Sequence, residues 1–269
     1  MSTTVHSLEP ADFISADAIT SPIEPQIIIC NIHGILSRGE WYHYLNEICQ
    51  ETLQPVIIKT CNYGFLGTIP FILSINKKQK VDKVSRTLRD INAQYPHCPI
   101  AIISHSFGTH LLTCALDADS TIRNIKYAFL FGSIVKNDDL TLISAHSKLI
   151  INDCGRYDII TILAEAYSKK YYEATGTYGF PVGWGNNVMN RFFDFGHSGA
   201  TKKSHVKDYV WPLIVGDAFR TKKFRGHFYN PGMPGYFRYC CVGALCLVLS
   251  LFLIFKLGLF GQVLHAMVE

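Results

Sequence analysis

Apolar runs of strand length alternate with segments of helical periodicity from about residue 26 onward. The runs at 26–32, 55–60, 99–104, 126–132, 148–152 and 188–195 are rich in Ile, Val, Leu and Phe. Such runs are typical of strands covered on both faces of a parallel sheet. Between them, helices are predicted over residues 40–50, 81–91, 106–116 and 202–215. This alternation predicts one α/β domain over residues 26–218, with a mostly parallel sheet and helices on both faces.

A second kind of apolar segment occupies residues 239–255 and, after Lys256, continues to about residue 261. A membrane-spanning helix needs about 20 apolar residues, and this segment is long enough if Lys256 extends its amine to the headgroups. Basic residues precede the segment and none follow Lys256, which favours a cytoplasmic domain. We therefore predict a single transmembrane helix over 239–261. The alternative is a buried core helix.

The remaining boundaries follow from composition. Residues 1–25 lack the basic and apolar regions of a secretory signal and are predicted to form a flexible leader. A basic, Pro/Gly-rich linker at 219–238 and a short tail at 262–269 flank the apolar segment. The 17% of charged residues is low and agrees with membrane contact, whereas a net charge of +4 is too small to indicate nucleic acid.

The nine cysteines show no metal-ligand spacing. Cys30, Cys61 and Cys114 lie in or beside apolar runs and are predicted to be small buried hydrophobes. With no secretory signal, this pattern favours free thiols in a reducing compartment.

The sequence Ser104-His105-Ser106-Phe107-Gly108 lies between a predicted strand and a predicted helix. Small residues at 104 and 108 allow a sharp turn that presents the Ser106 hydroxyl at the helix N-terminus. There the backbone N–H of Phe107 points to where an oxyanion would form. Ser106 is the predicted nucleophile. The alternative is an ordinary serine-rich turn.

A nucleophilic serine needs a base, and the base needs an orienting acid. Two acids follow the strand at 148–152. Asp158, beyond a glycine turn, is the favoured acid. Asp153 is the alternative, but it sits at the strand end, where it could simply cap the turn. The favoured base is His197, in the loop after the last predicted strand. His205 lies in the next helix, where a surface histidine is expected.

The other half of an oxyanion hole is expected after the first strand, where Asn31-Ile32-His33-Gly34-Ile35 ends in His-Gly. Gly34 allows the chain to turn so that the N–H of Ile35 faces Ser106. His33 is predicted to have a structural role.

These motifs resemble those of α/β-hydrolases. IICNIHGILSRGEW, SHSFGTH, IINDCGRYD and NRFFDFGHSG occur in the order found in that superfamily, and look like its bacterial serine esterase/lipase-like branch over residues 26–215. The resemblance implies acyl transfer to water: Ser106 attacks, His197 moves the proton and Asp158 orients the imidazole. It implies neither a metal nor an organic cofactor. Ser104 and Thr109 depart from the glycines common in that family.

Substrate and context are less constrained. The aromatic and Gly-rich segment 167–187 fits a lid or a packed connection equally well, and 62–73 offers apolar surface. The leading hypothesis is a membrane-anchored esterase or lipase acting on an acyl ester, phospholipid included. A peptidase or amidase of the same fold, and a non-catalytic sensor or scaffold, are the alternatives. Lipid and membrane are the expected partners, and protein partners stay open.

Overall fold

A six-stranded parallel sheet forms the centre of the computed structural model, which describes residues 26–35, 41–53, 55–64, 77–181, 187–216 and 227. The strand order is β2-β1-β3-β4-β5-β6. The strands are β1 (Ile27–Ile32), β2 (Val56–Thr60), β3 (Ile100–His105), β4 (Ile125–Phe131), β5 (Ser147–Gly155) and β6 (Val188–Phe193). Each predicted strand is confirmed, with boundaries that move by a few residues.

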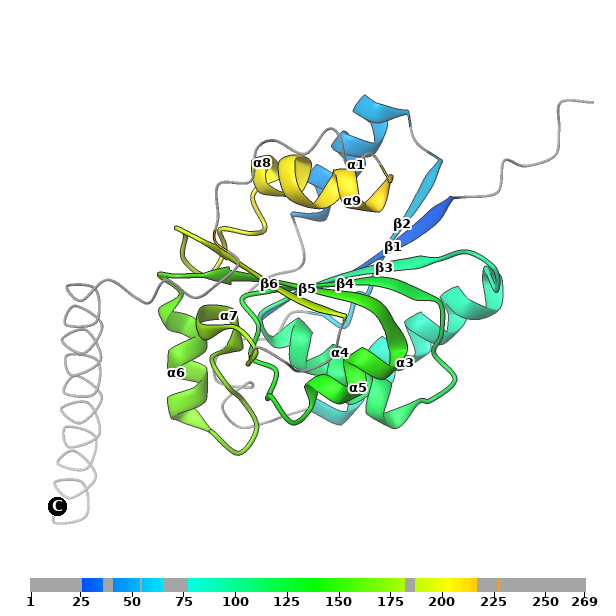
Figure 1. Cartoon of the computed structure of the whole chain (residues 1–269). Helices are drawn as coiled ribbons and strands as arrows, with labels where there is room; N and C mark the ends of the chain where they lie inside the picture. Colours follow the sequence, from blue (N-terminus) through cyan, green and yellow to red (C-terminus); the bar gives the residue numbers. More distant parts are fainter. Residues whose placement is uncertain are drawn as a thin grey trace, which may run out of the picture.

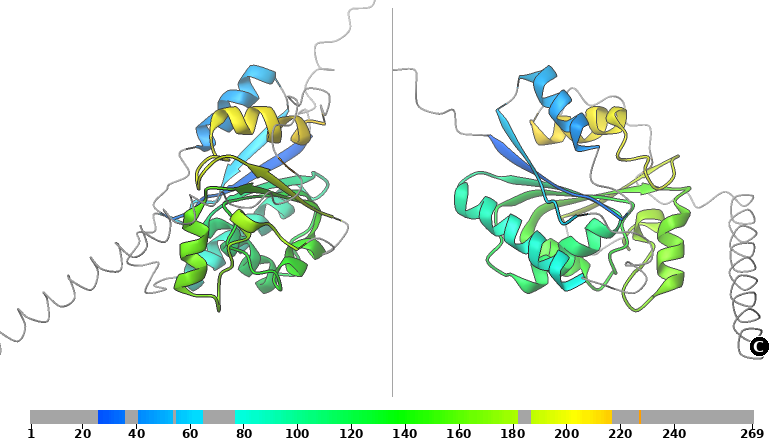
Figure 2. Two further views of the ribbon diagram at one scale, coloured as in Figure 1. Left: turned by 60° about the vertical axis from the view of Figure 1, so that its left-hand side comes forward. Right: turned by 180° about the vertical axis from the view of Figure 1, so that it is seen from behind.

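Helices cover both faces of this sheet (Figures 1 and 2). On one face lie α1 (Tyr42–Thr52), α8 (Lys203–His205) and α9 (Trp211–Ile214). The other face carries α3 (Lys77–Gln94), α4 (Phe107–Ala118), α5 (Leu140–His146), α6 (Ile159–Tyr167) and α7 (Thr175–Tyr178). The predicted α/β class with helices on both faces is confirmed. Because β2 lies on one side of β1 and β3 on the other, the strand order reverses between β1 and β3, and in open α/β sheets such reversals are where binding sites form, at the carboxyl ends of the strands.

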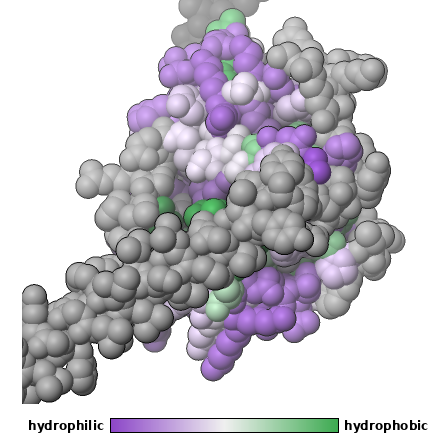
Figure 3. All heavy atoms as spheres, turned by 90° about the vertical axis from the view of Figure 1, so that its left-hand side faces the viewer, coloured by the Kyte–Doolittle hydropathy of each residue, from purple (hydrophilic) through white to green (hydrophobic). Residues whose placement is uncertain are grey.

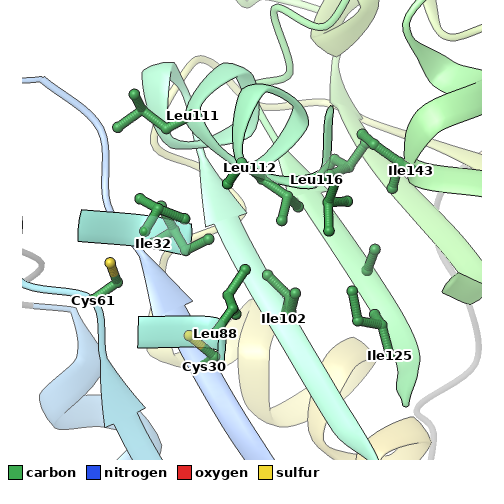
Figure 4. Close-up of a cluster of buried hydrophobic side chains, with 14 of the residues drawn as sticks. Cys30, Ile32, Cys61, Leu88, Ile102, Leu111, Leu112, Leu116, Ile125 and Ile143 are labelled. Atoms are coloured by element: carbon green, nitrogen blue, oxygen red, sulfur yellow. The ribbon is translucent and has the colours of Figure 1, made fainter. Parts of the chain in front are cut away.

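Alternate strand residues supply two cores. Figure 4 shows the larger one, where Ile32 of β1 and Ile102 of β3 meet Leu88 of α3 and Leu112 of α4. On the opposite face, β-strand residues such as Ile29 pack against α1 and α9. Successive side chains of a strand point to opposite faces, so a strand buried on both sides is apolar at most positions. This explains the continuous apolar runs in the sequence.

The cysteines fit this packing in part. Cys30 and Cys61 are buried in the larger core, as predicted, whereas Cys114 is only half-buried. Burial raises the pKa of the Cys30 thiol, and repulsion from Cys61 raises it further. These two residues therefore act as small hydrophobes.

The helix predicted at 202–215 is present but not continuous. A π-helical turn, Val206–Val210, joins α8 to α9, and Pro212 lies in the first turn of α9. Proline has no N–H and its ring crowds the carbonyl four residues earlier, so a regular α-helix cannot run through it. The wider turn accommodates Pro212.

Several predicted segments lie outside the described residues. They are the leader at 1–25, the transmembrane segment at 239–261, the tail at 262–269 and all of the linker at 219–238 except His227, which forms an antiparallel bridge with Phe192 of β6. Among the described residues, no helix is long and apolar enough to cross a membrane. The domain boundaries at 26–218 stay predictions.

Two buried histidines make this fold sensitive to acid. His105 ends β3 and His110 lies in α4, and both are buried. Burial lowers the pKa of each from 6.5 to about 3, with a smaller effect from nearby His197 on His105 and from Lys77 on His110. The folded state thus keeps both imidazoles neutral, while the unfolded chain can protonate them.

We predict that the free energy of unfolding falls as the pH drops from about 6.5 towards 3. Each histidine contributes about 1.4 kcal/mol per pH unit, because only the unfolded state gains its proton in that window. His110→Phe keeps a ring in the same place and should make the pH dependence shallower by about that amount. Urea unfolding of the full chain at several pH values measures the slope. An unchanged slope contradicts the prediction, and His97→Gln, at an exposed histidine, is the control.

Candidate active site

Ser106 occupies a strained turn between β3 and α4. Its backbone φ is 55° and ψ is −125°, a region that residues other than glycine rarely adopt. Two backbone hydrogen bonds hold the turn: the Ser106 N–H donates to the Phe131 carbonyl at 2.8 Å, and the Thr109 N–H donates to the Ser106 carbonyl at 2.9 Å. The strain points the Ser106 side chain away from both elements, to the carboxyl edge of the sheet.

The small residues at positions 104 and 108 are accommodated for different physical reasons. A Cβ atom added to Gly108 would lie 2.4 Å from the Ile32 carbonyl oxygen, so α4 can approach β1 only with glycine there. Ser104 is fully buried, and its hydroxyl donates to the Phe129 carbonyl at 3.2 Å. Serine is tolerated at this position because its one polar atom has a partner.

His197 lies between Ser106 and Asp158. Its Nε2 is 2.8 Å from the Ser106 Oγ, and its Nδ1 is 2.9 Å and 3.0 Å from the two Asp158 carboxylate oxygens. If Nδ1 carries the proton that Asp158 accepts, Nε2 is left to accept the serine proton. The structure therefore brings together the three favoured residues, from the ends of three different strands.

Asp158 is held by the helix that follows it. It is the N-cap residue of α6, where its Oδ1 accepts hydrogen bonds from the N–H groups of Ile160 (3.0 Å) and Thr161 (3.3 Å). The Thr177 hydroxyl of α7 donates to the Asp158 carbonyl at 2.6 Å. The carboxylate is 1% exposed, yet the positive end of the helix dipole and these donors stabilise its charge.

Two further residues at the site were not singled out by the sequence. Gly132 follows β4 with φ 52°, and a Cβ there would lie 2.9 Å from the His197 ring. The Nε2 of His105 is 3.1 Å from the His197 carbonyl oxygen. Because burial lowers the pKa of His105 to about 3, the ring is neutral and can donate this bond with an Nε2–H. In the sequence, Gly132 could have been noticed as a glycine that ends a strand run, and His105 as the histidine directly before Ser106.

The loop after β1 approaches Ser106, as predicted. A Cβ added to Gly34 would lie 2.8 Å from the Ser106 Cβ, so this contact needs glycine. Phe107 is the first residue of α4, and Ile35 is the last described residue of the loop. That the N–H groups of Ile35 and Phe107 bind an oxyanion stays a prediction. His33 is fully buried and stacks on Tyr63 with 4.0 Å between ring centroids, in agreement with a structural role.

The less favoured acid and base pair with each other. Asp153 is fully buried inside β5, in register with Arg191 of β6, which contacts its two carboxylate oxygens at 2.6 Å and 2.7 Å. His205 Nε2 is 2.8 Å from Asp153. Burial alone would raise the pKa of Asp153, but Arg191 and His205 hold it below its usual value.

Two expectations about this pair were wrong. His205 is buried rather than on the surface, because the edges of Phe131, Phe193 and Phe195 enclose its ring. Asp153 does not cap a turn, because β5 continues to Gly155 and leaves it within the strand. Neither residue contacts Ser106, since each is held in this separate network.

The segment after α6 is a packed connection over its described part, residues 167–181. Tyr172 and Phe180 belong to the larger core, and the Thr175 hydroxyl donates to the Val135 carbonyl at 2.9 Å. Residues 182–186 lie outside the described residues, as do 65–73 of the predicted apolar surface at 62–73. Of the two interpretations of 167–187, the structure favours the connection that supports Asp158 over a lid.

Strand order and the serine turn together identify the fold. The sheet is parallel, β1 lies inside it beside β2, and the strained serine joins β3 to α4. The chain has the α/β-hydrolase fold. Asp158 follows β5 and His197 follows β6, which is the order in which that fold places its acid and its histidine.

Comparisons with known proteins add few details. No family model matches this sequence, and neither does any curated protein. Similar solved structures include a cutinase-like protein from Cryptococcus sp., at 16% identity over 71% of this chain and 94% of that one, with a TM-score of 0.44. An esterase from Pyrococcus furiosus gives 14% identity, 71% and 79% coverage and a TM-score of 0.45. An acetyl xylan esterase is 12% identical over 73% of this chain and 98% of that one, with a TM-score of 0.39.

The Asp153 network predicts a large effect of one substitution. Arg191→Met should lower the free energy of unfolding by about 3–5 kcal/mol, because it leaves a buried carboxylate without its guanidinium partner. Urea unfolding measures the loss. The matched control is Lys207→Met, which breaks an exposed contact with Glu51 and should cost little. If the two variants are equally stable, the network does not have this role.

Proposed function

We propose that this protein is a serine hydrolase that cleaves acyl esters, with Ser106 as nucleophile, His197 as general base and acid, and Asp158 as the orienting carboxylate. One observation carries the proposal: an unbroken hydrogen-bonded series runs from Asp158 through His197 to Ser106, and it ends on a serine in a strained turn. Strain of this kind persists where the surrounding structure holds it, and it is concentrated at reactive sites.

The reaction would proceed in two halves. In the first, the Ser106 Oγ bonds to the acyl carbon as its proton moves to His197 Nε2. The resulting oxyanion collapses, the ester C–O bond breaks, and the leaving alcohol takes the proton from Nε2. In the second half, water attacks the acyl-enzyme, gives a proton to Nε2, and Ser106 regains it as the acid leaves. The N–H groups of Phe107 and Ile35 are the proposed oxyanion donors.

An ester with an apolar acyl chain is favoured by the surface of α6. This helix begins where Asp158 caps it, and its sequence IITILAEAY is almost entirely apolar. Ile160, Leu163 and Tyr167 are 41%, 37% and 50% exposed, at the spacing of one helical face. We call these three residues the α6 stripe. Figure 3 views the end of the molecule at which α6 lies and shows hydrophobic residues scattered within a mostly hydrophilic surface. An exposed apolar stripe on the helix that begins at Asp158 suits a lipid-like acyl group.

The same surface supports a membrane partner. Tyr171 and Tyr178 are 44% and 47% exposed after the α6 stripe, and Lys77 and Lys170 lie 4.9 Å and 5.2 Å from the Tyr171 ring centroid. Tyrosine with lysine is typical of surfaces that contact lipid headgroups. We propose that residues 239–261 anchor the protein to a membrane and that the hydrolase domain is cytoplasmic. A peptidase would use the same triad, but nothing described here favours an amide.

The triad is tested with a fluorophosphonate probe, which reacts only with an activated serine. Wild-type protein should be labelled, and Ser106→Ala should lose labelling and ester hydrolysis by about 10⁴-fold or more, with His197→Ala similarly impaired. Ser104→Ala is the matched control, because it removes a buried hydroxyl two residues away and leaves the triad intact. A folded wild type that is not labelled, or a labelled Ser106→Ala, contradicts the proposal.

The α6 stripe is tested by acyl-chain preference. Ile160→Ser combined with Leu163→Ser should raise KM for p-nitrophenyl laurate about 10-fold, because each side chain loses apolar contact worth about 1.5 kcal/mol or less. KM for p-nitrophenyl acetate should stay unchanged. Leu53→Ser is the control, since Leu53 is also an apolar surface residue, 89% exposed, but follows α1 on the other face of the sheet. Equal effects on both esters would exclude the stripe as an acyl-binding surface.

A further inference from the structure

Tyr63, in the loop after β2, contacts the loop that approaches Ser106. The side chain is buried, with 3% exposed, and its ring stacks on His33 at an interplanar angle of 18°. Its hydroxyl lies within hydrogen-bond reach of the carbonyl oxygens of His33 and Gly34, the latter at 3.2 Å. The phenol can donate its proton to either carbonyl. One side chain thus contacts two successive peptide groups of a loop that is distant in sequence.

The direction of these two carbonyls determines where the next N–H groups point. In a trans peptide unit, the C=O and the following N–H point in opposite directions, and the peptide bonds of this loop are trans. With the Gly34 carbonyl turned to Tyr63, the N–H of Ile35 has to point away from Tyr63. The same loop also meets the turn that carries Ser106, since a Cβ on Gly34 would lie 2.8 Å from Ser106 and 3.2 Å from His105.

We propose that Tyr63 is a positioning residue that holds the loop at 33–35 in the orientation needed to bind the oxyanion formed on Ser106. It acts through the peptide group between Gly34 and Ile35 and does not touch the substrate. This inference rests on the proposed function, because an oxyanion forms only if Ser106 attacks an acyl group.

The surroundings of Tyr63 keep it suited to this role. Burial raises the pKa of the phenol well above its usual value, so the hydroxyl stays protonated and remains a donor. Lys80 of α3 donates to the Tyr63 carbonyl at 3.2 Å, and its amine lies 5.2 Å from the centre of the ring. His33 adds a second contact, because its Nδ1 is 2.9 Å from the Gly34 carbonyl oxygen. The loop is therefore held from the side opposite Ser106.

Tyr63→Phe separates the hydroxyl from the rest of the side chain. The ring contacts with His33 and Lys80 remain, and only the hydrogen bond to the loop is lost. We expect kcat for an acyl ester to fall about 10- to 100-fold, somewhat less than the loss of an oxyanion donor itself, with KM within about twofold of wild type. Affinity for a trifluoromethyl ketone, which forms an oxyanion on the serine, should fall by the same factor as kcat/KM.

Controls separate positioning from general loosening. Tyr95→Phe removes a hydroxyl from another tyrosine packed against the same core, at the end of α3, and should leave kcat and ketone affinity unchanged. If Tyr63→Phe does not fold, Lys80→Met is used instead. It frees Tyr63 from α3 and should lower kcat and ketone affinity together, by a smaller factor.

The outcomes distinguish this inference from the proposed function. If the wild type neither hydrolyses esters nor binds the ketone through Ser106, the proposed function is wrong and this inference is wrong with it. If the wild type is active but folded Tyr63→Phe keeps full kcat and ketone affinity, only the role of Tyr63 is overturned. A fall in thermal stability with kcat unchanged also overturns it, since that result assigns Tyr63 a purely structural role.

Discussion

The site depends on the close approach of β1, β3 and α4 around Ser106. The strained backbone of Ser106 is held by a hydrogen bond to Phe131 of β4, and Gly108 lets α4 touch the end of β1. The same contact brings Gly34 against Ser106, so nucleophile and candidate oxyanion loop are positioned by one packing arrangement. Since protein interiors are close-packed, an added methyl group at Gly34 or Gly108 would displace one of these elements.

The described part of the domain contains two Asp–His pairs, one buried on both sides and one with a partly exposed histidine, and their charged neighbours differ. Asp153 is paired with the Arg191 guanidinium on the next strand through both carboxylate oxygens, in addition to its contact with His205. Within the described part of the chain, Asp158 has His197 as its one ion-pair partner, and helix N–H groups supply the rest of its stabilisation. Asp158 can therefore stabilise an imidazolium that forms on His197 during proton transfer. Asp153 instead connects the sheet to α8 through His205, and its charge is already paired with Arg191.

Most of the architecture was predictable from the sequence because strand runs and helical periodicity are local signals. The six strands and the close set of Ser106, Asp158 and His197 follow from those runs, since the carboxyl ends of parallel strands meet at one edge. Contacts between distant segments carry no such signal. Arg191 opposite Asp153 depends on strand register, and the burial of His205 depends on which face of the helix meets the sheet. The hydrophobic periodicity of a helix extends over several turns, so it also gives no sign of the single π-helical turn before Pro212.

The residues that sequence reasoning missed have a common property: they act on the backbone or on the space around the triad. Gly132 makes room for the His197 ring, His105 can donate to the His197 carbonyl, and Tyr63 can donate to the carbonyl of His33 or of Gly34. A triad within hydrogen-bond distance is effective only if its members cannot relax, and catalytic geometry is sensitive to errors of about 1 Å. Each of these three contacts restricts one movement of the residues around the triad. A histidine kept neutral by burial and a phenol kept protonated by burial suit this role, because both remain hydrogen-bond donors.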